Sequence, residues 1–328
     1  MYSGRQTRDD ADSTVWSVEE AVSEKVDIYS RSTYPPIVLD TGYYLKCMVG
    51  GILSCGPTHT ALTPLDVAKC NMQTDPAKYK DLIGSLQTIA EEEGLGSLWK
   101  GWLPTLLGYS AQGLFKFGLY EVCKDLYSNL AGEEIAYVYR GLICLAGAAS
   151  AEVFADVALC PMEMVKVKVQ TSPRGTFPTA FGAALSKLWK DSKMTGFPFK
   201  SLVPLWLRQV PYTMTKFYFF EKIVEVLYAT VLTEPRMSYR MGIQLAVTFI
   251  AGYLAGVICA IVSNPADAVV SKMGGGGVSP VQVLSELGFE GVWNGLGTRM
   301  LIIGTLTGVQ WWIYDTFKTL FGMGTTGG

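Results

Sequence analysis

The 328-residue sequence is poor in charge and has no excess of either sign. Only 17% of its residues are charged, against roughly 25% in soluble domains, 49% are hydrophobic, and the mean hydropathy is positive. The net charge of -2 and the lack of Lys/Arg runs leave no electrostatic footprint for nucleic acid, which we exclude as a partner. This composition favours a polytopic membrane protein over a soluble enzyme.

Histidine and paired cysteines are scarce as well. The seven cysteines lie scattered, without a C-x-x-C pattern or metal-ligand spacing, so neither a disulfide framework nor a metal site is indicated. The sequence also shows no nucleophile-base set and no phosphate-cradling loop. We therefore expect a protein that is not an enzyme and uses no cofactor.

What the sequence does have is six long apolar segments, each sufficient for a membrane crossing of about 20 residues. Polar residues recur within them at helical spacing and should face one another rather than lipid. An acidic stretch at 1–36 precedes them, and its composition predicts a disordered tail. The segments lie near residues 41–69, 102–128, 137–168, 202–229, 239–270 and 297–320.

A proline followed two residues later by a carboxylate occurs three times. The motifs are Pro64-Leu65-Asp66, Pro161-Met162-Glu163 and Pro265-Ala266-Asp267, spaced 97 and 104 residues apart. Such recurrence predicts a threefold internal repeat. We divide the chain into the tail at 1–36, repeats at 37–133, 134–234 and 235–321, and a Gly-rich tail at 322–328.

Over about residues 40 to 320 the three copies resemble the mitochondrial carrier family, on the proline motifs and on Glu93-Gly94 with Trp99-Lys100-Gly101. The resemblance implies an all-α membrane protein with six transmembrane helices in three pseudo-symmetric repeats around a central cavity. Short surface helices would lie on the matrix side. It further implies a transporter of the mitochondrial inner membrane that works as a monomer among membrane lipids, including cardiolipin.

Charged residues recur at both ends of the helices. A proline kink with an acid and a base one turn apart brings opposite charges toward the helix axis. By the resemblance, a matrix gate comprises Asp66, Lys69, Glu163, Lys166 and Asp267, and a cytoplasmic gate comprises Glu121, Lys124, Glu221, Asp315 and Lys318. Each set lacks one base, because Val270 and Val224 stand in its place. Ordinary surface salt bridges at helix ends are the alternative interpretation.

Residues on the same helical face as the cytoplasmic acids indicate the cargo. Five residues before each acid stand Lys116, Lys216 and Gln310, and cations and amides follow farther back. Such a set predicts an anion site, although lysines that reach toward the helix ends would explain the pattern otherwise. The predicted substrate residues are Lys116, Lys216, Arg208, Gln112, Gln209, Tyr212 and Gln310.

Three titratable residues lie on the odd-numbered segments. They are His59, the single histidine of the chain, and the acids Glu152 and Asp156, which are one helical turn apart. Ionisable groups inside an apolar span suit proton handling, so we predict that these residues couple transport to protons. For His59, simple hydrogen-bonded packing remains an alternative.

The stretches around His59, Lys116, Lys216 and Gln310 are similar to those of phosphate-transporting members of the family. They imply that the partners are inorganic phosphate and a proton, by phosphate/H+ symport or phosphate/OH- exchange with alternating access. Two alternatives stay open. One is a carrier for a dicarboxylate, a keto acid or copper, and the other is a non-transporting membrane adaptor that acts through its acidic tail.

Overall fold

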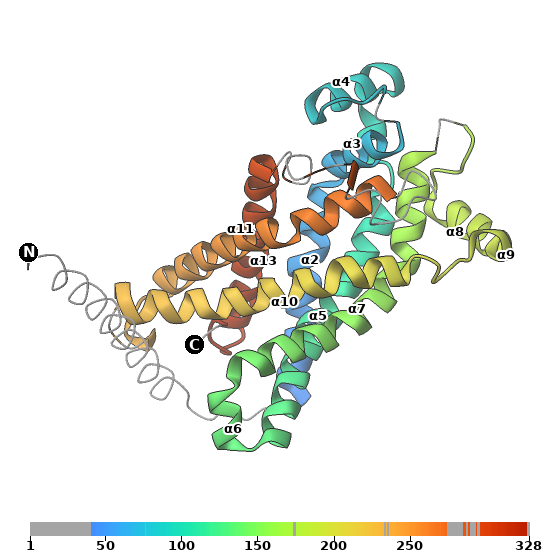
Figure 1. Ribbon diagram of the computed structural model, residues 1–328. Coiled ribbons are helices and arrows are strands. Elements are labelled where there is room, and N and C mark those ends of the chain that lie inside the picture. The colour runs from blue at the N-terminus through green and yellow to red at the C-terminus, as the bar shows by residue number, and fades with distance from the viewer. Residues whose placement is uncertain are drawn as a thin grey trace, which may run out of the picture.

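The computed structural model describes residues 41–75, 77–172, 175–232, 234, 236–273, 285–286, 288, 293 and 296–326. The predicted tail at 1–36 and residues 327–328 of the second tail lie outside this part of the chain. Every regular element within it is a helix (Figure 1). The elements are α2 (Thr41–Ala61), α3 (Thr63–Thr74), α4 (Leu82–Glu93), η1 (Leu95–Trp99), α5 (Trp102–Ala131), α6 (Glu133–Val138), α7 (Arg140–Thr171), α8 (Phe181–Lys190), α9 (Ser192–Thr195), α10 (Leu202–Leu227), η2 (Tyr228–Leu232), η3 (Arg236–Ser238), α11 (Met241–Met273) and α13 (Leu296–Leu320).

The six long helices close into a ring. Each of α2, α5, α7, α10 and α11 packs against the next in sequence, and α13 returns to pack against α2. They cross one another obliquely rather than running parallel (Figure 1). A closed ring of this kind gives every long helix one face toward the interior and one face toward the surroundings.

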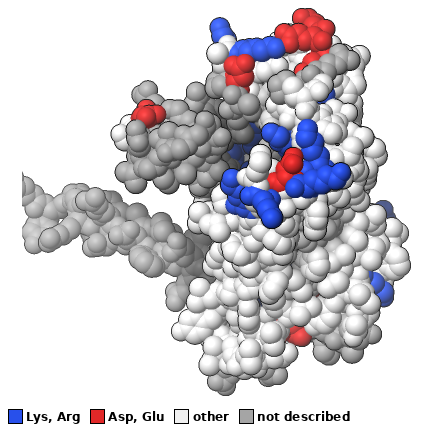
Figure 2. Space-filling view, turned by 90° about the vertical axis from the view of Figure 1, so that its right-hand side faces the viewer, with Lys and Arg blue, Asp and Glu red and all other residues white. Residues whose placement is uncertain are grey.

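Two of the long helices, α7 and the Met241–Pro265 part of α11, are long and apolar enough to cross a membrane by length and composition alone. The other four contain more polar and small residues, including the buried Lys116 and Lys216. Such residues lower the average apolar character of a helix without exposing charge to lipid, provided that they face inward. Figure 2 shows a broad outer surface with few charged residues.

A motif proline lies at the break between α2 and α3, within α7 and within α11. α2 ends at Ala61 and α3 begins at Thr63, immediately before Pro64, whereas Pro161 and Pro265 lie inside α7 and α11. Proline lacks the backbone donor and crowds the preceding turn, so each of these helices is locally weakened beside its carboxylate. The three motif acids therefore all follow a proline at the same end of the ring.

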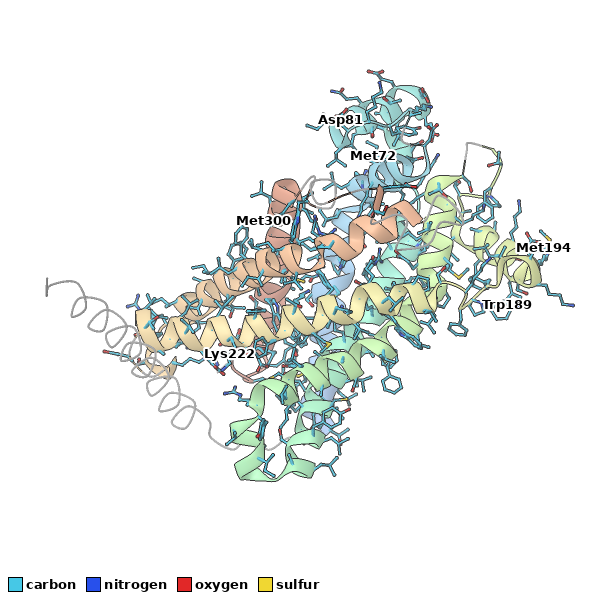
Figure 3. All side chains as sticks on the ribbon, viewed as in Figure 1. Met72, Asp81, Trp189, Met194, Lys222 and Met300 are labelled. Carbon is cyan, nitrogen blue, oxygen red and sulfur yellow. The ribbon has the colours of Figure 1, made fainter. Side chains whose placement is uncertain are left out.

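Short helices cover that end. α4 and η1 pack against α3, and α8 packs against α7. Trp189 and Met194 project from α8 and α9 away from the long helices (Figure 3), and both are exposed. Together with the exposed Lys187 and Lys190, they give α8 and its neighbour the mixed apolar and basic character of helices that lie at a membrane surface.

Glycine sets the closest approach between α2 and α5. A Cβ added to Gly51 would lie 2.1 Å from the carbonyl oxygen of Gly113, and one added to Gly113 would lie 2.2 Å from the carbonyl oxygen of Gly51. Small residues let helix backbones pack this tightly in membranes. At this point the first two long helices therefore meet backbone to backbone.

The substitution Gly51→Ala should therefore separate the two helices and lower the unfolding temperature of the detergent-solubilised protein. Overpacking of this kind costs about 1–3 kcal/mol, and rigid backbone leaves little room for relaxation. The matched control is Gly182→Ala on α8, where nothing lies within 4 Å of the added Cβ. Equal unfolding temperatures for the two variants would contradict this account of the contact.

Candidate functional site

Two buried lysines, one on α5 and one on α10, occupy the middle of the ring. The Nζ atom of Lys116, on α5, lies 3.0 Å from Oε2 of Glu152 on α7. Lys216 Nζ, on α10, donates a hydrogen bond of 2.6 Å to Oε1 of Gln310 on α13. Lys116 and Lys216 are only 5% and 3% exposed, so their charges are shielded from bulk water. We call Lys116, Lys216, Gln310, Glu152 and Asp156 the central layer.

The two acids of this layer share one amide. Gln112 Nε2 donates to Glu152 Oε1 at 2.8 Å and to Asp156 Oδ1 at 3.2 Å. Both carboxylates are completely buried, and Asp156 Oδ2 has no hydrogen-bond partner in the part of the chain that the structure describes. Lys116 forms its ion pair with Glu152, so Asp156 lacks an equivalent cation among the ion pairs of the described residues. A buried acid in this position can accept a proton at low electrostatic cost.

Full ionisation would leave the central layer without net charge. The two lysines contribute two positive charges, and the two carboxylates contribute two negative charges when ionised. Because uncompensated charge is expensive in a buried site, an added anion requires the simultaneous gain of positive charge. Protonation of one carboxylate supplies it. The geometry thus suits an anion that travels with a proton.

His59 lies beside this layer and connects it with one end of the ring. Its imidazole stacks on the ring of Tyr109, with centroids 3.8 Å apart and an interplanar angle of 11°. The same tyrosine ring lies 5.1 Å from Lys166 Nζ. A change in the charge of His59 would therefore change the electrostatic energy of the charged residues that follow the prolines.

Those residues, Asp66, Lys69, Glu163, Lys166 and Asp267, form what we call the proline-end cluster. Lys166 Nζ lies 2.8 Å from Asp66 on the first repeat and 3.6 Å from Glu163 on its own helix. Lys69 takes part in none of the ion pairs of the described residues, and the side chain of Asp267 lies outside them. Within the described residues, one ion pair between repeats is thus formed at this end.

A second charged cluster lies at the opposite end of the ring, and we call it the aromatic-end cluster. It comprises Glu121, Lys124, Glu221, Asp315 and Lys318. Lys124 Nζ lies 3.4 Å from Glu121 on its own helix and 3.3 Å from Glu221 on α10. Tyr120 donates a 2.6 Å hydrogen bond to the same Glu221, which is buried. Charge-assisted bonds of this kind tie the first repeat to the second.

Sequence reasoning missed an aromatic layer between the central layer and this cluster. Phe117, Phe217 and Trp311 stand four residues before the acids of the three repeats, and all are at most 1% exposed. Their ring centroids lie 5.1–5.4 Å apart. They close the interior on that side. Their equal spacing from Glu121, Glu221 and Asp315 was a signal that could have revealed them.

Of the predicted substrate residues, Arg208 does not join the central layer in this conformation, and no hydrogen bond or ion pair links Tyr212 or Gln209 to that layer among the contacts of the described residues. Arg208 lies at the proline end, with Nη2 4.0 Å from Glu163. The carbonyl of Tyr212 accepts a bond from Cys259 Sγ at 3.2 Å, and Gln209 is partly buried. Gln112 and Gln310 do join it. Across the described residues no group of three His, Cys, Asp or Glu could hold a metal ion.

The Lys116–Glu152 pair yields a stability prediction. Glu152→Ala leaves a buried lysine without its carboxylate, and breaking such a pair costs about 3–5 kcal/mol. Replacing both partners by methionine removes both charges and should lower the unfolding temperature less than Glu152→Ala does. Thermal unfolding in detergent measures both. A double variant that is less stable than the single one would contradict the pairing.

Comparison with known proteins agrees with this architecture. A family model described as "Mitochondrial carrier protein" matches residues 40–130, 139–230 and 242–324. "Phosphate carrier protein, mitochondrial" of Caenorhabditis elegans is 54% identical over 84% of this chain and 81% of its own length. "Solute carrier family 25 member 3" of Bos taurus is 52% identical, over 85% and 76%. "Mitochondrial phosphate carrier protein 2, mitochondrial" of Arabidopsis thaliana is 50% identical, over 93% and 81%. The chain, with its three helical repeats, belongs to the mitochondrial carrier family.

Proposed function

We propose that this chain transports inorganic phosphate across the mitochondrial inner membrane together with protons, by phosphate/H+ symport or phosphate/OH- exchange. The observation that carries the proposal is the central layer, which combines two buried lysines with two buried carboxylates, whose charges are opposite and equal in magnitude when all four groups are ionised. The relatives named as phosphate carriers support phosphate as the anion. The relatives named as carriers also support transport rather than catalysis.

Phosphate would bind by replacing protein partners of the lysines. Its oxygens accept charge-assisted hydrogen bonds from Lys116 and Lys216 and a further bond from the amide of Gln112. Glu152 loses its lysine in this exchange and, with Asp156, receives the proton that keeps the layer neutral. His59, stacked beside the layer, is the second candidate for carrying that proton.

The two charged clusters would act as gates of an alternating-access cycle, the proline end toward the matrix and the aromatic end toward the cytoplasm. Phosphate enters past the aromatic end, binds, and weakens the pairing of Lys166 with Asp66 through the stacked His59 and Tyr109. Arg208, which lies near Glu163, would hold phosphate as it leaves toward the matrix. Ligand binding moves such an equilibrium only through different affinities for the two states.

We also propose the repeat boundaries 37–133, 134–234 and 235–321, function as a monomer, and contact with membrane lipids, including cardiolipin. One chain already supplies the complete ring of helices, so it needs no second copy to form the path.

Uptake of labelled phosphate into liposomes that contain the purified protein tests the function. With an inwardly directed proton gradient we expect phosphate to accumulate above its external concentration, and collapse of the gradient by an ionophore should abolish this accumulation. Proton coupling predicts this dependence for symport and for hydroxide exchange alike. Absence of phosphate uptake by a preparation that shows a cooperative unfolding transition would refute the proposal.

Lys216→Ala should abolish phosphate uptake while the protein still expresses and inserts. The loss follows because one of the two buried cations of the central layer is removed. Lys222→Ala, on the same helix but with a 44% exposed side chain, serves as the matched control and should transport normally. Full uptake by the Lys216 variant would remove this residue from the site.

The same liposomes separate the alternatives. Inhibition of phosphate uptake by malate would favour a dicarboxylate carrier, and inhibition by copper a shared copper path. Deletion of residues 1–36 tests the adaptor interpretation, since an adaptor that acts through the acidic tail would lose its function whereas a carrier would keep transporting phosphate.

A further inference from the structure

Asp315 is the exception among the acids of the aromatic-end cluster. It is completely buried, yet among the described residues no lysine or arginine forms an ion pair with it. In the other two repeats the corresponding acids, Glu121 and Glu221, both lie within 4 Å of Lys124. The repeat pattern would place a base at position 224, but Val224 stands there, buried in the apolar core.

The chain that follows α13 supplies the missing partner. It turns back at Gly322, where φ is 71° and the N–H of Met323 donates to the carbonyl of Lys318. The C-terminus lies close to the end of α13 (Figure 1). The backbone N–H of Thr326 donates to Asp315 Oδ1 at 2.9 Å, and Thr248 on α11 donates to Oδ2 at 2.8 Å. Both carboxylate oxygens therefore have a neutral donor, which compensates part of the cost of burying the charge.

Every other polar group of Thr326 is engaged as well. Lys318 Nζ donates to its Oγ1 at 3.0 Å, and Arg236 Nη2 donates to its carbonyl at 3.4 Å. Thr325 Oγ1 lies 3.5 Å from Gln244 Oε1, and Met323 packs against the main apolar core. Thr325 and Thr326 are 9% and 5% exposed, so this segment is part of the packed end of the ring rather than a surface tail.

We propose that residues 323–326 form a latch that closes the aromatic end, with Thr326 in the role that a base on α10 has in a complete set. The proposal rests on the proposed gating role of this cluster. The latch ties the end of α13, through Asp315 and Lys318, to the beginning of α11 through Gln244 and the adjacent Arg236, while Thr248 on α11 bonds Asp315 directly. That end opens only when Thr326 leaves Asp315.

A latch differs from an ion pair to α10 in how it is released. A latch outside the six helices can be released without moving α10, whereas an α10 base would have to separate together with its helix. The proposal therefore makes the segment after α13 a determinant of how often the aromatic end opens, independent of the phosphate site.

Opening can be followed by labelling Cys55. It is 2% exposed and occupies the position in repeat one that Glu152 occupies in repeat two, so it lies deep in the ring. The other six cysteines are replaced by serine, and labelling by a water-soluble maleimide is timed in detergent without phosphate. Thr326→Pro removes the backbone donor to Asp315, and deletion of residues 323–328 removes the latch entirely.

Both variants should label Cys55 about tenfold faster than the parent, which corresponds to about 1.4 kcal/mol in the opening equilibrium. Thr326→Ser keeps all three groups and should label at the parent rate. Adding Val224→Lys to Thr326→Pro supplies a base for Asp315 and should slow the labelling again. Parent rates in the proline variant and in the deletion would overturn the latch. Because the assay contains no phosphate, it gives the same answer whether or not the chain transports that anion.

Discussion

The buried pair of Lys116 with Glu152 is the interaction on which the rest of the structure depends. Charge at this depth is tolerated only when it is compensated, and here two lysines balance two carboxylates in one layer of the ring. Such a site cannot gain a bare anion without a penalty, but it can gain an anion with a proton. The requirement that buried charge be compensated thus accounts both for the ion pair in the protein without phosphate and for the proton coupling in the proposed cycle.

The threefold repeat sets the arrangement of the helices, and the residues that differ between repeats form the central layer. Phe117, Phe217 and Trp311 keep the symmetry and close the interior. The acids Glu152 and Asp156 occur only in the second repeat, at positions where the third repeat has Gly256 and Ala260. A symmetric ring would present three equivalent sets of side chains to a ligand. In this ring the carboxylates of the central layer are on α7 and its lysines are on α5 and α10.

The fold could be predicted from the sequence because its signals are periodic. The proline motifs and apolar segments led to six transmembrane helices in three repeats, and membership of the mitochondrial carrier family confirms that interpretation. Lys116 and Gln112 were predicted as substrate residues and Glu152 as a proton-coupling residue, and the structure brings the three together, although their roles stay predictions.

Other contacts could not have been predicted because they join residues without a common period. Arg208 lies eight residues before Lys216, about 12 Å along the helix, so it reaches the proline end instead of the central layer. The partner of Asp315 is the backbone N–H of Thr326, which no side-chain pattern predicts. A Gly-rich composition suggested a tail after residue 321, whereas the described part of that segment is packed and hydrogen-bonded.

Proton exchange on phosphate binding tests the charge balance of the central layer most directly. Purified protein in weakly buffered detergent solution is mixed with phosphate at the same pH, and the proton change is corrected for the ionisation of phosphate itself. The account predicts that the protein takes up about one proton for each dihydrogen phosphate bound, and that Glu152→Gln with Asp156→Asn abolishes this uptake. Phosphate binding without any proton uptake by the unaltered protein would contradict it.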